Sequence, residues 1–124
     1  MKTIFLITAL SLPLMSHGAP LSTAISGDKL IRQYLGDPSQ RHATPKGDAY
    51  VDRETARGYM DGVKDLTEGE RWCDPRNAPP HEIHIDVVQA IAQLSADRRR
   101  TNAAVLVLET LSRLYPCKPN GGKS

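Results

Sequence analysis

An apolar segment at the start of the chain constrains its fold more than any other feature, because it has the pattern of a secretory signal peptide. In residues 1–18, one positive charge precedes an apolar run, residues 4–15, that is too short to span a bilayer comfortably. We expect cleavage after Gly18, with cleavage after Ala24 or an uncleaved anchor as alternatives. Residues 19–124 should then fold as a single domain, exported to the periplasm, where the compartment is oxidising.

The charge and aromatic content of the chain exclude two classes of partner. Lys and Arg number 16 against 14 Asp and Glu, which gives a formal net charge of +2. This surplus is too small to attract nucleic acid or an anionic lipid surface. Aromatic residues make up 5% of the chain, too few for a surface on which bases stack. We therefore expect no nucleic-acid partner and, after signal cleavage, no membrane partner.

The chain has two cysteines, Cys73 and Cys117, and export makes one intramolecular disulfide between them the expected state. Free thiols or metal-bound thiolates are the alternative. A bridge across a loop of this size stabilises a fold by about 4 kcal/mol. That is a large fraction of the total stability of a small domain, about 5–15 kcal/mol.

Apolar residues recur at helical spacing in four segments of the chain, and no segment shows the alternation of a strand. The four segments are residues 28–35, 48–67, 81–96 and 102–115. They predict an all-α fold, a small bundle of about four helices with one disulfide. The last two helices should be antiparallel, since residues 97–100 form a short turn between them and the disulfide joins their outer ends.

The second and last helices carry the most specific packing predictions. We expect the core-facing stripe of the second helix to consist of Val51, Thr55, Tyr59, Gly62, Val63 and Leu66. Gly58 and Gly62 share a face, which predicts that another helix or a dimer mate lies close against them. At the helix ends, Pro80 should lie in the first turn of the third helix and Thr101 should cap the fourth. Val105 should widen the buried stripe of that last helix.

No motif of an enzyme is present, and we expect neither catalytic residues nor a cofactor. The chain lacks a Gly-x-Ser-x-Gly nucleophile elbow, a His-Glu-x-x-His zinc motif and a phosphate-binding glycine loop. His81 and His84 have the i,i+3 spacing of a metal-binding pair, but exposed polar residues at a helix start are the simpler interpretation. Asp61 and Asp65 are likewise expected on a solvated helix face. We therefore expect no metal site.

Three short motifs follow one another in order over residues 56–117. They are Gly-Tyr-x-x-Gly-Val at 58–63, aromatic-Cys-x-Pro at 72–75 and a closing aromatic-Pro-Cys at 115–117. Together with the apolar helices between them, they make the chain resemble the type VI secretion amidase immunity proteins of the Tai/Rap group.

The resemblance implies a small helical periplasmic protein, often a homodimer. Such a protein binds and inhibits a cognate peptidoglycan amidase effector and so protects the cell from intoxication by a sister cell. The positions that match the shared frame, Gly58, Tyr59, Gly62, Cys73 and Cys117, would bear the fold. No effector-binding residue is carried over, because no matching contact motif is visible.

The chain departs from the family pattern at one position, and two other functions remain as alternatives. Many relatives carry a further cysteine in the first helix, where this chain has Tyr34, which leaves Cys73 and Cys117 to pair with each other. A small periplasmic acid-stress chaperone would also be helical, exported and bridged by one disulfide. A secreted structural or solute-binding module is the third possibility.

The polar turn between the last two predicted helices is the candidate contact surface for a partner. It consists of Asp97, Arg98, Arg99 and Arg100, and the three guanidinium groups would meet acidic groups in an enzyme cleft. An exposed turn without a partner is the simpler alternative. Trp72 is expected to pack against the disulfide rather than to bind a ligand.

Overall fold

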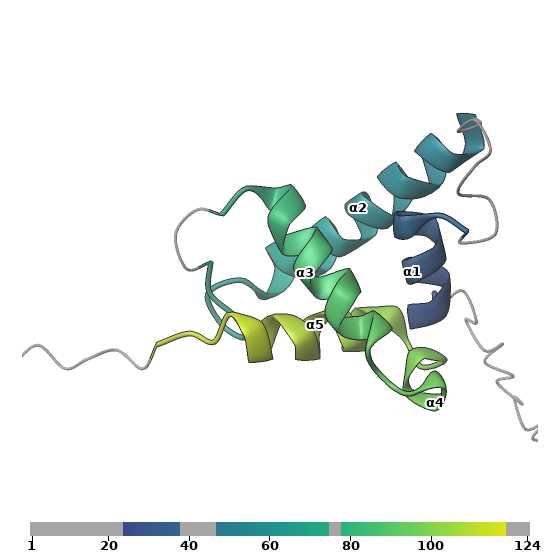
Figure 1. Cartoon of the computed structure of the whole chain (residues 1–124). Helices are drawn as coiled ribbons and strands as arrows, with labels where there is room; N and C mark the ends of the chain where they lie inside the picture. Colours follow the sequence, from purple (N-terminus) through teal and green to yellow (C-terminus); the bar gives the residue numbers. More distant parts are fainter. Residues whose placement is uncertain (1–23, 38–46, 75–77, 119–124) are drawn as a thin grey trace, which may run out of the picture.

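The computed structural model describes residues 24–37, 47–74 and 78–118, which form five helices (Figure 1). They are α1 (Gly27–Leu35), α2 (Gly47–Thr67), α3 (Pro80–Ala92), α4 (Ala96–Arg99) and α5 (Ala103–Leu114). These described residues contain no strand, only two isolated bridges. The predicted all-α fold is confirmed, although the third helix ends earlier than predicted and the predicted turn after it is the short helix α4.

Two predicted segments lie outside the described residues. They are the signal peptide, residues 1–18, and the alternative cleavage region up to residue 23. None of the helices in the described part of the chain combines the length and the apolar character needed to cross a membrane.

Four helices build the core, and every one of them contributes buried side chains. α1 and α5 each contact both α2 and α3, while α4 reverses the chain between α3 and α5 (Figure 1). Removal of any of the four would therefore expose apolar surface of its neighbours. The buried apolar residues are Leu30, Tyr34, Ala56, Met60, Trp72, Ile83, Val87, Val88, Ile91, Ala103, Leu106, Val107 and Leu111.

The helix ends follow the expected chemistry with one shift. Pro80 opens α3, as predicted. The cap of α5 is Asn102, whose side-chain oxygen accepts hydrogen bonds from two amides of the first turn. The prediction that Thr101 caps this helix is wrong, because its hydroxyl donates instead to the carbonyl of Arg98 at 2.7 Å. Val105 is exposed rather than buried.

The buried face of α2 is not the predicted one. Ala56, Met60 and Lys64 are buried, while only Tyr59 and Val63 of the predicted stripe pack against the core. Ala and Met are less hydrophobic than Val and Leu, so their spacing indicates a buried face less clearly. A lysine that buries its aliphatic stem still counts as polar in an analysis of apolar periodicity. The N-terminal half of α2 also projects past the other helices (Figure 1), so its apolar side chains stay exposed.

The glycines of α2 are likewise exposed. A Cβ added at Gly58 or Gly62 would meet no atom of another described helix within 4 Å, so the predicted close approach of another helix of this chain is wrong. Approach of a dimer mate stays a prediction. Close approach occurs instead at Gly27, where a Cβ would lie 2.6 Å from Cδ1 of Leu106 and 2.8 Å from the carbonyl oxygen of Arg99.

Residues at the start of α1 pair with the junction between α4 and α5. The amide of Gly27 donates to the carbonyl of Thr101 at 3.1 Å, and the amide of Ala103 donates to the carbonyl of Ile25 at 2.7 Å. These two bonds fix where α1 enters the bundle.

Cys73 and Cys117 form the predicted disulfide, with their Cα atoms 4.8 Å apart. Beside the bridge, the amide of Cys73 donates to the carbonyl of Tyr115 at 2.9 Å. Trp72 is buried, and its indole N–H donates to the carbonyl of Lys64 at 3.2 Å. The bridge therefore joins the segment before α3 to the end of α5, as the antiparallel arrangement predicts, and Trp72 is a core residue.

Candidate functional site

Asp61, Lys64 and His84 form a polar cluster between α2 and α3. Oδ1 of Asp61 accepts a hydrogen bond from Nζ of Lys64 at 3.0 Å and lies 2.7 Å from Nε2 of His84. Lys64 and His84 expose only 7% and 3% of their surface. The ring of Tyr34, from α1, stands edge-on to the imidazole with the centroids 6.2 Å apart. One carboxylate thus links buried groups at the meeting point of three helices.

The surroundings of this cluster favour a carboxylate beside a neutral imidazole. Burial lowers the pKa of His84 most, and the charges of Lys64 and Arg57 lower it further, against the opposing effect of Asp61. Burial raises the pKa of Asp61, but the hydrogen bonds from Lys64 and His84, together with the charge of Lys64, outweigh it and hold that pKa below its usual value. Both partners of Asp61 are buried, while its own side chain is 42% exposed, so the cluster ties α2 to α3 and leaves the carboxylate in partial contact with solvent.

The histidine pair that the sequence singled out is divided by the fold. His81 is exposed at the start of α3, whereas His84 turns inward to Asp61. The expectation of two exposed histidines is therefore wrong for His84, and Asp61 is not a purely solvated residue. Asp65 is exposed, as expected. Within the described ranges, no group of three or more His, Cys, Asp or Glu residues could hold a metal ion.

Arg99, in the middle of the predicted partner-binding turn, has a structural role. Its Nε donates to Oδ1 of Asp28 at 2.9 Å, and its Nη1 donates to the carbonyl of Leu94 at 2.7 Å. The guanidinium therefore fastens α4 to α1 and to the segment that follows α3. Its replacement would disturb the fold as well as any contact with a partner.

The neighbours of Arg99 in α4 are exposed. Arg98 pairs with Glu109 of α5, and Arg100, the residue after α4, pairs with Asp97. Exposed ion pairs of this kind contribute little to stability, so either arginine can exchange its partner for an incoming acidic group at small cost. Contact of this surface with a partner stays a prediction.

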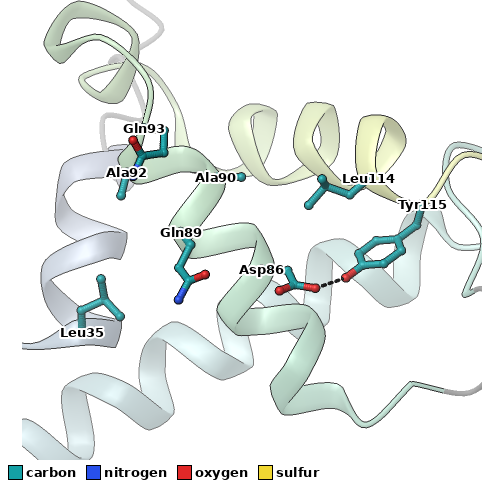
Figure 2. Close-up of a pocket in the computed structure, with 8 residues that line it drawn as sticks. All are labelled: Leu35, Asp86, Gln89, Ala90, Ala92, Gln93, Leu114 and Tyr115. Atoms are coloured by element: carbon teal, nitrogen blue, oxygen red, sulfur yellow. Dashed lines mark hydrogen bonds between the residues drawn. The ribbon is translucent and has the colours of Figure 1, made fainter.

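An open groove of about 830 Å³ crosses the outer face of α3 (Figure 2). Ala90, on α3, is one of the residues that line it. Leu35, from the end of α1, and Leu114, from the end of α5, stand on either side and are 50% and 36% exposed. The remaining lining residues are Asp86, Gln89, Ala92, Gln93 and Tyr115.

A hydrogen-bonded pair, Asp86 and Tyr115, marks one end of this groove. The Tyr115 hydroxyl donates to Oδ2 of Asp86 at 2.6 Å (Figure 2). Burial, this hydrogen bond and the charges of Asp86, Glu82 and Asp74 hold the pKa of Tyr115 well above its usual range. The lining includes a carboxylate but no Lys, Arg or His, so this end of the groove is negative.

Sequence reasoning missed both the groove and the polar cluster. One signal for the groove was present, since Asp86, Gln89 and Gln93 lie at helical spacing on the face opposite the buried residues of α3. Its walls, however, are leucines from the ends of two other helices, and no local pattern places those side chains beside α3.

Comparison with known proteins gives one family. The model of the Rap1a immunity proteins matches residues 26–117. A search of curated proteins finds no match. The matched range begins at the cap of α1 and ends at Cys117, so it contains all five described helices and both half-cystines.

Proposed function

Because the chain belongs to the Rap1a immunity protein family, we propose that it binds and inhibits a peptidoglycan amidase effector delivered by the type VI secretion system of a sister cell. The observation that carries this proposal is the family match over residues 26–117. This match favours immunity over the acid-stress chaperone that the sequence left open. The disulfide supports action in the periplasm, because such bridges persist in oxidising compartments.

In this proposal the protein acts by occupancy and not by turnover. Immunity proteins act by binding, and the buried polar groups of this chain tie helices together. Inhibition should therefore be stoichiometric. Protection must also outlast exposure to the toxin, which requires slow dissociation and a nanomolar complex, about −12 kcal/mol.

The exposed side of α4 is the first contact surface that we propose. Arg98 and Arg100 are held only by exposed ion pairs, so their guanidinium groups are available for carboxylates of an effector cleft. Asp97 lies on the same turn and would exchange Arg100 for a cation of the partner. Arg99 supports this surface from within through Asp28. Homodimerisation, which the family resemblance implies, is a further part of the proposal.

Toxicity and inhibition assays test this function directly. Cells that lack the gene should lose viability when sister cells with an active secretion system attack them, and a periplasmic copy of the protein should restore viability. Titration of a purified amidase of that system should abolish activity at one binding equivalent. Survival of the deletion strain under a firing secretion system, with every amidase of that system still active in the presence of the protein, would refute immunity.

Charge reversal on α4 tests the contact surface separately. The double variant Arg98→Glu/Arg100→Glu should lower the melting temperature only slightly, because it replaces two exposed ion pairs by exposed like-charge contacts. It should weaken effector binding at least about tenfold. Glu70→Lys, on an exposed turn between α2 and α3, is the matched control. Unchanged affinity of the double variant would place the contact elsewhere.

A further inference from the structure

The groove across α3 has the shape of a docking site. Ala90 is a small residue of the lining and leaves a hollow on α3, and two leucines of the lining, Leu114 on one side of α3 and Leu35 on the other, remain exposed. Apolar side chains that flank a hollow on the surface are typical of interaction sites. An apolar side chain that covers Ala90 would remove apolar surface of the groove from water, which is the main source of affinity in such contacts.

The charges at the groove specify which segment fits it. Asp86 lines one end, and Glu82 and Asp74 are close enough to act on the same phenol, that of Tyr115. Covering Asp86 with an uncharged partner would cost free energy, because its carboxylate would lose water without gaining a cation. A Lys or Arg of the partner would supply that cation beside Asp86.

The remaining polar lining suits a peptide backbone. Gln89 and Gln93 each offer two amide donors and one carbonyl acceptor along the exposed side of α3. These groups can pair with main-chain N–H and C=O groups of any sequence. Specificity then comes from the apolar hollow and from the negative end.

We propose that this groove binds a segment of the amidase effector that places an apolar side chain over Ala90 and a Lys or Arg beside Asp86. The inference rests on the proposed function and adds a second contact surface to it. The end of the groove at Ala92 and Gln93 lies only a few residues before α4, so one partner can cover the groove and the exposed arginines of α4 together.

Binding measurements with groove variants test the inference. The probe is the purified effector that the protein neutralises in the assays above, and affinity is measured by isothermal titration calorimetry. Ala90→Trp fills the hollow and should weaken binding at least about tenfold. Gln89→Lys/Gln93→Lys changes only exposed side chains and adds two cations, so it should repel the cationic segment by a similar factor even if Ala90→Trp fails to fold. Asp86→Asn should weaken binding and reduce its salt dependence.

A control and an oligomer measurement complete the test. Leu66→Trp places the same indole at an exposed position outside the groove and should bind like the wild type. If the wild type neutralises no effector, the proposed function fails. If the wild type binds and the groove variants bind equally well, only the groove assignment fails. An equal loss of affinity in Leu66→Trp would also overturn the groove assignment. So would groove variants that no longer form dimers but bind the effector as tightly as the wild type, because the groove would then bind a second copy of this chain.

Discussion

Replacement of both Cys73 and Cys117 by alanine should lower the free energy of unfolding by about 4 kcal/mol. The bridge joins residues that are 44 positions apart, and the chain-entropy relation for a loop of this length gives about 4 kcal/mol at 25 °C. The loss should arise in the unfolded state. In the native state the same ends stay together through the hydrogen bond from Cys73 to Tyr115 and through the buried Trp72 beside it.

Urea unfolding measures this loss, with the fluorescence of Trp72, the only tryptophan in the chain, as the probe. The variant should unfold at a lower midpoint and with a larger m-value, because its unfolded state is no longer held compact. The near-UV circular dichroism of the folded variant should match that of the wild type, and reduced wild type should unfold like the variant. A loss below about 1 kcal/mol, or an altered native spectrum, would refute an origin in unfolded-chain entropy.

Three further predictions concern single positions. The pKa of His84 lies below its usual value of 6.5, so the unfolded state takes up the proton first. The stability from this group is complete above about pH 6.5 and declines as the pH falls from the pKa of His84 in the unfolded state to its lower pKa in the folded state. His84→Gln should flatten this part of a plot of urea midpoint against pH, and an unchanged slope of that plot would contradict the assignment. Gly27→Ala should cost about 1–3 kcal/mol in thermal or chemical unfolding, because the new Cβ meets Leu106 and backbone, and a neutral result would show that this contact is looser than described. Gly62→Ala should stabilise by up to about 1 kcal/mol through helix propensity, whereas destabilisation that depends on protein concentration would indicate a dimer mate on this face.

Much of the fold was predictable because the buried faces of the helices consist of apolar residues at helical spacing, which can be seen in the sequence. α1, α2 and α5 begin and end within about one residue of the segments with apolar periodicity, 28–35, 48–67 and 102–115. The disulfide followed from the expected export and from the presence of two cysteines. Pro80 marked the start of α3, since its ring suits the first helical turn.

The rotation of α2 and the candidate site could not be read from the sequence. Lys64 is buried because Asp61 pairs with it and with His84, which lies 23 residues further along the chain. A polar side chain enters a core only when another element supplies its partner, and local periodicity carries no information about that partner. The groove depends in the same way on Leu35 and Leu114, which come from the first and last helices.

The pairing of Ile25 and Gly27 with residues 101–103 has a consequence for the order in which the chain folds. The ion pair between Arg99 and Asp28 spans 71 residues, so the contacts that seat the first helix become available only when nearly the whole polypeptide has been made. Contacts between such distant segments delay folding. We therefore expect a chain with this topology to stay open during its synthesis and to close as one cooperative unit only after its last helix has been made.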